Sequence, residues 1–137
     1  MTAPRVGKML AKVSAEQLAK FGSETPGINL AVLSTTDGFE VASYKGSQSV
    51  SAKMAAMGSS LQALSEAITR EAGLKAGRRL TIESDDGCVL AIGIAETTPA
   101  MSLVVVADRS ASLGHLLWSA KICCKSVSRA VGEAGVN

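Results

Sequence analysis

A catalytic centre would have to be built from few residues in this chain of 137 residues. The single histidine is His115, and no acidic residue close in sequence can orient its ring as a Ser–His–Asp arrangement requires. The glycines Gly73 and Gly77 are followed by Arg78 and Arg79 instead of the Lys-Ser/Thr pair that ends a phosphate-binding loop. The sequence therefore points away from nucleotide hydrolysis and from enzymatic activity in general.

The cysteines and the paired aspartates also lack the spacing of a metal site. Cys123 and Cys124 are adjacent, whereas zinc ligands are separated by two or more residues. We expect Cys124 on the core-facing stripe of a helix, with Cys123 beside it. Asp85 and Asp86 precede a glycine, and a tight turn explains this sequence without a metal. We expect no catalytic, metal or cofactor site.

Composition excludes several kinds of partner. The net charge of +2 and the aromatic content of 3% argue against a nucleic-acid partner, which would need cations and stacking platforms. No apolar run approaches the ~20 residues that span a bilayer, and three cysteines do not pair off evenly, so we expect a reduced, cytoplasmic protein. The length suits one domain over 1–137, with a core at about 5–131 and a frayed tail at 132–137.

Four cations gather around the end of the central helix: Arg70, Lys75, Arg78 and Arg79. Cations at this position stabilise the negative end of the helix dipole. They could also form a docking rim for an acidic partner surface, and the sequence leaves both interpretations open.

The last helix carries two apolar residues away from its core-facing stripe. Trp118 and Ile122 fall on the side of Lys125 and Arg129. Either Trp118 packs against the first helix, or it is an exposed anchor for a partner, a role that tryptophan often has in interfaces.

The order of the elements predicts the fold. Helices are expected over 5–21, 49–72 and after Asp108, and strands over 28–34, 39–44, 79–84, 88–95 and 101–107. Tight turns join neighbouring strands, so the sheet is antiparallel. The last three strands form a meander, and its final strand, 101–107, is too apolar to lie at an edge. The only equally apolar strand that can lie beside it is 28–33, which gives the order 2-1-5-4-3. Helices one and three share one face and the central helix covers the other, in a three-layer α+β domain.

The central helix carries two stripes. Its large-residue stripe steps by three and four positions, and a small-residue stripe lies beside it. We expect the large residues to cover the chain's own sheet and the small residues to meet a second helix. The alternative is a helix deep in a single core. The large-residue stripe is Val50, Met54, Met57, Leu61, Leu64 and Ile68, and the small-residue stripe is Ala52, Ala56, Ser60, Ala63 and Ala67.

The strand at 79–84 predicts self-association. No proline or inward charge blocks this edge, and open edges invite pairing. Two copies paired along it would bring their central helices together in a twofold-symmetric homodimer. Alternatively, the loop at 74–78 folds over the edge. The residues predicted for the dimer interface are Ala56, Met57, Ser60, Leu61, Ala63, Leu64, Leu80 and Ile82.

Four stretches resemble one family pattern in their order and spacing. They are Thr25-Pro26-Gly27, Thr36-Asp37-Gly38-Phe39-Glu40-Val41-Ala42-Ser43, Ala55-Ala56-Met57-Gly58-Ser59-Ser60-Leu61 and Ala107-Asp108-Arg109-Ser110-Ala111-Ser112-Leu113-Gly114. With these stretches, the chain resembles a roadblock/dynein light chain domain from about Thr25 to Arg129. The family includes bacterial partners of Ras-like small GTPases.

The resemblance implies a profilin/longin-like fold, a homodimer with a continuous sheet, and a role in binding or regulating a small GTPase. Some bacterial members of the family accelerate GTP hydrolysis without inserting an arginine finger. We therefore expect a non-catalytic homodimeric module that binds a Ras-like small GTPase, and that is a candidate GTPase-activating protein. Two other functions remain open: a dimeric assembly scaffold without effect on nucleotide turnover, and a small-ligand sensor, for which the strands offer few polar groups.

Overall fold

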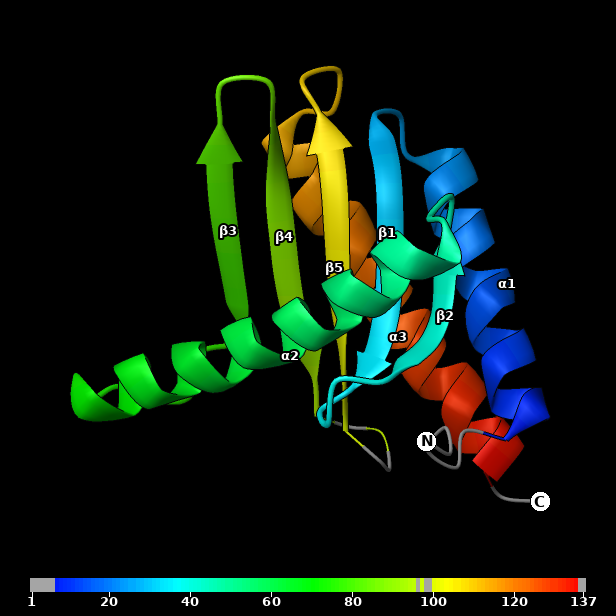
Figure 1. Cartoon of the computed structure of the whole chain (residues 1–137), viewed down its shortest axis with the longest axis horizontal. Helices are drawn as coiled ribbons and strands as arrows, with labels where there is room; N and C mark the ends of the chain where they lie inside the picture. The colour runs from blue at the N-terminus through cyan, green and yellow to red at the C-terminus, as the bar shows by residue number, and fades with distance from the viewer. Residues whose placement is uncertain (1–6, 96, 98–99, 136–137) are drawn as a thin grey trace.

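A computed structural model describes residues 7–95, 97 and 100–135. Three helices and five strands alternate along the chain in the predicted order (Figure 1). Their bounds are α1 Lys8–Glu24, β1 Ile28–Thr35, β2 Glu40–Tyr44, α2 Gln48–Glu71, β3 Arg79–Ser84, β4 Gly87–Ile94, β5 Met101–Asp108 and α3 Leu113–Gly135.

The five strands form one antiparallel sheet in the order β2-β1-β5-β4-β3, which confirms the predicted topology. Helix α2 crosses one face, and α1 and α3 lie together on the other, so the domain has three layers (Figure 1). The inner strands β1 and β5 pair over most of their length, for example Val32 opposite Val104. Strands that are apolar throughout need cover on both faces, and the two helical layers provide it.

The main core lies between the sheet and the α1/α3 layer. It joins Leu18 and Phe21 of α1 to Leu90 and Leu103 of the sheet and to Leu116 of α3, all of them buried. The core under α2 is much smaller and contains Leu30, Val32 and Ala55. The two faces of the sheet are therefore packed very differently.

Helix α1 continues to Glu24, so the prediction that it ends at Phe21 was wrong. Gly22 does not break the helix, because it lies where α1 crosses β2: a Cβ there would come 2.2 Å from Cε2 of Tyr44. The predicted start at residue 5 lies outside the described residues. At the other end of the chain, α3 runs past Gly132 to Gly135, and residues 136–137 also lie outside the described part.

Helix α2 has defined ends. The Ser47 hydroxyl accepts a hydrogen bond from the Val50 N–H at 3.3 Å, which satisfies one of the free donors at a helix start. Gly73 has φ +76°, and its N–H donates to the Arg70 carbonyl at 3.0 Å, as in a helix end that uses a left-handed glycine. The last turns of α2 project beyond β3, the final strand of the sheet (Figure 1). Within the described residues, no helix combines the length and apolar character needed to cross a bilayer.

Candidate functional site

The orientation of α2 differs from the prediction. Its buried residues are small, namely Ser51, Ala55 and Gly58, and these face the sheet. The large-residue stripe was expected to cover the sheet, but Leu64 is 57% exposed and Ile68 is 60% exposed. The prediction was therefore wrong about which residues cover the sheet.

This orientation follows from the small size of the residues where α2 contacts the sheet. A Cβ at Gly58 would lie only 2.3 Å from Cγ2 of Val104, so the helix approaches β5 closely only because this position has no side chain. Farther along the same face, Gln62 lies over Gly93 of β4, where a Cβ would come 2.7 Å from Nε2 of Gln62. Small side chains on one element and a glycine on the other bring the helix onto the sheet and leave the large-residue stripe outside.

The exposed face of α2 carries an apolar groove of about 420 Å³. Two large residues, Met57 and Leu64, are exposed there, and Leu61 is half-buried. The small-residue stripe flanks the groove, with Ala63 exposed beside it. The groove is lined by Ala56, Met57, Ser60, Leu61 and Leu64, all of which were predicted for the dimer interface.

Strand β3 is the last strand of the sheet. Leu80 and Ile82 pair with Ala91 and Val89 of β4, whereas the alternating residue Leu90 of β4 belongs to the core on the α1/α3 side. Because residues paired across an antiparallel ladder share a face, Leu80 and Ile82 lie on the α2 side. Ile82 is 44% exposed, so the open edge and the α2 groove belong to one side of the molecule.

The loop at 74–78 is held against α2. The Gly77 N–H donates to Oγ1 of Thr69 at 3.0 Å, and Nε2 of Gln62 donates to the Gly77 carbonyl at 3.4 Å. These bonds direct the loop under the projecting end of α2. They give no support to the alternative in which the loop covers the edge of β3.

The predicted cation cluster is divided between two sides of the sheet. Arg70 lies in the last turn of α2, and Lys75 lines a shallow hollow next to Gln62 and Glu66 of the same helix. Arg78 lines this hollow as well, and together with Arg79 it lines a different cleft, which faces α3. The structure therefore does not bring all four cations to one surface.

Trp118 is 62% exposed and lies at a groove of about 310 Å³ between α1 and α3. Its ring stacks on that of His115, with centroids 6.1 Å apart and planes inclined by 30°. Ile122 follows one turn later in the same groove and is also exposed. Trp118 therefore touches the groove beside the first helix while most of its surface stays accessible.

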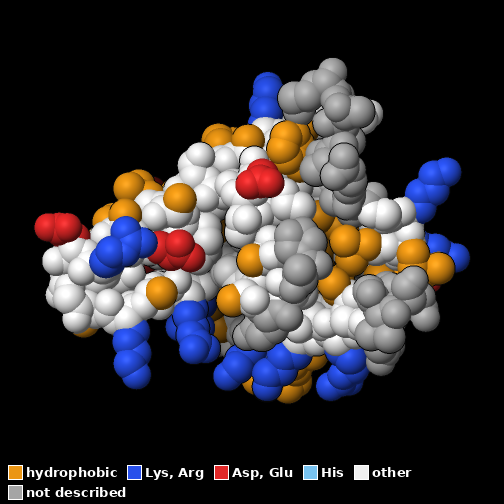
Figure 2. Space-filling view, turned by 90° about the horizontal axis from the view of Figure 1, so that it is seen from below, with side chains coloured by type: hydrophobic (Ala, Val, Ile, Leu, Met, Phe, Trp, Pro, Cys, Tyr) orange, Lys and Arg blue, Asp and Glu red, His pale blue; other side chains and the backbone are white. Residues whose placement is uncertain are grey.

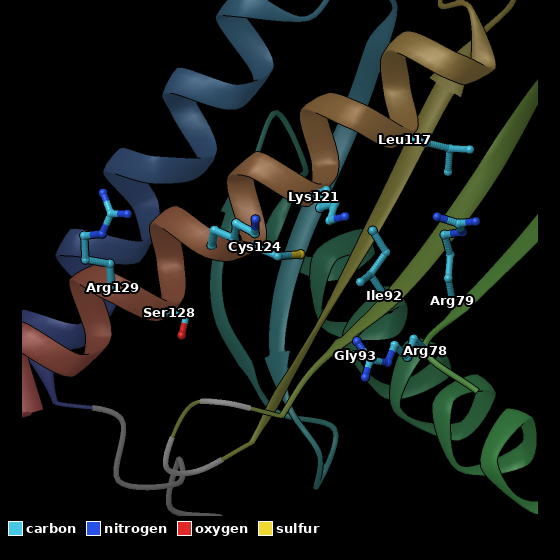
Figure 3. Close-up of a pocket in the computed structure, with 10 residues that line it drawn as sticks. Arg78, Arg79, Ile92, Gly93, Leu117, Lys121, Cys124, Ser128 and Arg129 are labelled. Atoms are coloured by element: carbon cyan, nitrogen blue, oxygen red, sulfur yellow. The ribbon is translucent and has the colours of Figure 1, made fainter. Parts of the chain in front are cut away.

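The cleft lined by Arg78 and Arg79, between α3 and the β3–β4 end of the sheet, was not predicted. It has a volume of about 620 Å³ (Figure 3). Arg78 and Arg79 come from the sheet side, and Lys121, Lys125 and Arg129 come from α3. The four-residue spacing of the α3 cations is visible in the sequence, but their proximity to β3 is not. In Figure 2, several Lys and Arg side chains lie along the lower margin of the molecule, and others lie at its top, left and right.

The cysteines pack differently from the prediction. Cys123 is buried and Cys124 is half-buried, the reverse of the expected arrangement. Cys123 follows Ala120 by three residues and precedes Val127 by four, so it continues the buried row of α3. Burial raises the pKa of the Cys123 thiol to about 12, which leaves it uncharged and a poor nucleophile at neutral pH.

Polar side chains in the turns have local partners. The Ser84 hydroxyl donates to Oδ1 of Asp86 and lowers the pKa of that carboxyl. Oδ1 of Asp108 accepts hydrogen bonds from the hydroxyl and the N–H of Ser110, which lower its pKa. Among the described residues, no group of three or more His, Cys, Asp or Glu side chains could hold a metal ion. These contacts order the turns and assemble no reactive centre.

The three layers and the sheet order define the chain as an α+β domain that has an exposed apolar helix face beside an open sheet edge. Residues 15–107 match the family model described as the Roadblock/LC7 domain. The chain belongs to the Roadblock/LC7 family, which confirms the resemblance found in the sequence. No curated protein matches the chain.

Several solved structures have the same fold. A Roadblock/LC7 domain from Streptomyces avermitilis is 22% identical, with a TM-score of 0.75 over 82% of this chain and 92% of that one. The gliding protein MglB from Thermus thermophilus is 17% identical, with a TM-score of 0.81 over 96% and 99%. An MglB with a tetrameric arrangement is 19% identical, with a TM-score of 0.82 over 97% and 99%. At these identities the likeness shows the fold.

Proposed function

We propose that this chain is a non-catalytic homodimeric regulatory module that binds a Ras-like small GTPase. The observation that carries the proposal is the row of large apolar side chains on α2, exposed beside the open edge of β3. Family membership supports the choice of partner, because bacterial relatives of this family include partners of Ras-like GTPases. The similar MglB with a tetrameric arrangement supports self-association.

In the proposed dimer, the β3 edges of two copies pair about a twofold axis and extend the sheet. The two α2 helices then lie side by side, and the apolar groove of each receives the large side chains of the other. The interface consists of Ala56, Met57, Ser60, Leu61, Ala63, Leu64, Leu80 and Ile82. All of these are exposed or half-buried in the single chain.

The estimated binding energies indicate that the dimer needs both the exposed face of α2 and the edge of β3. Met57 and Leu64 are each between half and two thirds exposed, so covering one of them contributes roughly 1 kcal/mol. With Ile82, and counted over two copies, the gain is roughly 6 kcal/mol. Association costs about 4–15 kcal/mol. Apolar contact alone therefore holds the dimer weakly, and backbone hydrogen bonds between the β3 edges must add to it.

The predicted partner-binding residues divide in the same way as the surfaces. Arg70 and Lys75 lie at the projecting end of α2, and we assign them to the rim of the GTPase-binding surface. Trp118 and Ile122 line the groove beside α1 on the other face of the sheet. They remain candidates for a contact that does not involve α2.

The dimer is tested with Leu64→Glu, because Leu64 is 57% exposed and contributes little to the chain's own core. Met9→Glu is the matched control, since Met9 on α1 is 62% exposed and distant from the proposed interface. Sedimentation velocity should show a dimer for the wild type and the control, and a folded monomer for Leu64→Glu. A dimer that persists in Leu64→Glu, or a monomeric wild type, would overturn the interface.

The partner is tested by affinity capture from lysate of the native cell, run in parallel with GTPγS and GDP. Recovery of a Ras-like GTPase mainly with GTPγS supports the proposal, and single-turnover GTP hydrolysis by the purified pair then decides whether the module accelerates turnover. A GTPase captured with no change in hydrolysis indicates an effector. Recovery of other proteins, independent of nucleotide, would replace the proposal with the assembly scaffold.

A further inference from the structure

The cleft between α3 and the β3–β4 end of the sheet is a concave surface that the chain itself leaves open. In Figure 1, α3 runs behind β5 and β1 while β3 stands clear of it. The space left along the flank of α3 is the hollow of about 620 Å³. It lies on the opposite face of the sheet from α2, so it is not part of the proposed dimer and GTPase surfaces.

All charged side chains that line this cleft are cationic. On the helix wall, Lys121, Lys125 and Arg129 follow one another at intervals of one turn. On the sheet wall, Arg78 and Arg79 precede and begin β3. All five of these residues are exposed, although the net charge of the chain is only +2. Positive charge is therefore concentrated on both walls of one hollow, where it raises the local concentration of anions.

The floor of the cleft is apolar. Ile92 of β4 and Leu117 and Cys124 of α3 are half-buried there, and the sticks in Figure 3 show Ile92 and Cys124 between the two walls. Gly93 lines the cleft with its backbone alone, because a Cβ there would point to the other side of the sheet, toward the amide of Gln62. An occupant would bury apolar groups on the floor and place negative charges against both walls.

Shape and charge together select one class of occupant. From Leu117 to Arg129 the helix wall extends for about 18 Å at 1.5 Å per residue, which is longer than a single phosphate group can bridge. A flat anionic membrane would meet the rim but could not reach the concave floor. We propose that this cleft binds an acidic amphipathic peptide segment of a partner protein, with apolar residues on the floor and Asp or Glu side chains against both walls.

The probe for this inference is a fluorescein-labelled synthetic peptide of about 14 residues, long enough to follow the helix wall. Leucines at intervals of three and four form one stripe, and the remaining positions are glutamate. A second peptide has glutamine at every glutamate position. Fluorescence anisotropy with the full chain at low salt should show binding of the acidic peptide, and binding of the glutamine peptide at least about tenfold weaker.

The cleft is altered by the double variant Lys121→Glu/Lys125→Glu. The matched control is Lys8→Glu/Lys12→Glu, which makes the same charge change at the same spacing on α1, with both lysines exposed and outside the cleft. The cleft variant should bind the acidic peptide at least about tenfold more weakly than the wild type, and the control should stay within about twofold. Circular dichroism checks that both variants are folded.

Three results would overturn the inference. The first is an affinity that falls equally in the cleft variant and the control, which would indicate attraction by net charge alone. The second is loss of binding in Leu64→Glu with no loss in the cleft variant, which would move the peptide to α2. The third is a peptide that does not bind, while vesicles containing phosphatidylserine or inorganic phosphate bind the wild type and not the cleft variant. Because Leu64→Glu disrupts only the proposed dimer, failure of the dimer and failure of the cleft are distinguishable.

Discussion

Gly58 lies where α2 closely approaches β5, and Gly58→Ala tests the orientation of the helix. A new Cβ would stand 2.3 Å from Cγ2 of Val104, and Val104 is buried with a β-branched side chain that rotates little. Overpacking of this kind costs about 1–3 kcal/mol. Alanine in place of glycine within a helix returns about 1 kcal/mol. We expect a net destabilisation of about 1 kcal/mol.

A double-mutant cycle with Val104→Ala isolates the contact. Val104→Ala alone removes two buried methyl groups and should cost about 2 kcal/mol. In the double variant, the methyl group added at position 58 occupies space that the valine side chain has vacated. The combined loss should therefore be smaller than the sum of the single losses by about 1–2 kcal/mol, which is a typical coupling energy for residues in contact.

The assay is urea unfolding followed by circular dichroism, at one protein concentration for all variants. Gly114→Ala is the control, because Gly114 lies in α3 and a Cβ there would meet nothing within 4 Å. This control should be neutral, or more stable by up to about 1 kcal/mol. If Gly58→Ala behaves like the control, or if the two changes at 58 and 104 are additive, the close approach of α2 through its small residues is refuted.

Two further predictions concern the turn before β1 and the buried thiol of α3. Gly27 has φ +91°, and a Cβ there would lie 2.7 Å from the Ala111 nitrogen, so Gly27→Ala should lower the free energy of unfolding by at least about 2 kcal/mol in the same urea assay; an unchanged midpoint would contradict this. The pKa of Cys123 is raised to about 12, so the unfolded chain releases its thiol proton first as the pH rises above about 9. Stability falls from there, by about 1 kcal/mol at pH 10. Cys123→Ala should lack this part of the pH dependence, and equal slopes in the two proteins between about pH 8 and 10 would show that the thiol titrates normally when folded.

The topology could be predicted from the sequence because the turn sequences and the apolar pattern of each strand indicate its connections and its place in the sheet. Turn sequences such as Asp37-Gly38 and Asp85-Asp86-Gly87 mark antiparallel connections. Strands that are apolar on both faces have to be central, and this placed β1 beside β5. Such patterns are local, so they can be recognised without knowledge of the tertiary contacts.

The orientation of α2 could not be predicted in the same way. A stripe of large apolar residues shows that one face of a helix is covered, but it does not show by what. Ser51, Ala55 and Gly58 form the row that touches the sheet, and small residues carry almost no hydrophobic signal. The predicted interface residues are exposed or half-buried in the single chain, and their contact with a second copy stays a prediction.

The cationic cleft was missed for a different reason. Arg79 and Lys121 are more than 40 residues apart in the sequence, and only the folded sheet brings the β3 side of the domain near α3 (Figure 3). The exchange of Cys123 and Cys124 has a simpler cause. An apolar helix face of about 100° or more contains two neighbouring rows of residues. A rotation of the helix by one residue position decides which row, that of Cys123 or that of Cys124, is buried.

Because small residues cover the sheet, the outer face of α2 makes the stability of this chain depend on the concentration of a protein that binds there. The large side chains on this face lie outside the domain core. They contribute hydrophobic free energy only when another surface buries them. By mass action, a protein that covers them, and does not bind the unfolded chain, stabilises the fold by about 2.7 kcal/mol at a free concentration of about 100 times Kd. The cellular concentration of that protein therefore contributes to how long each molecule stays folded and is not degraded. If the chain pairs with itself, its own copy number has this effect.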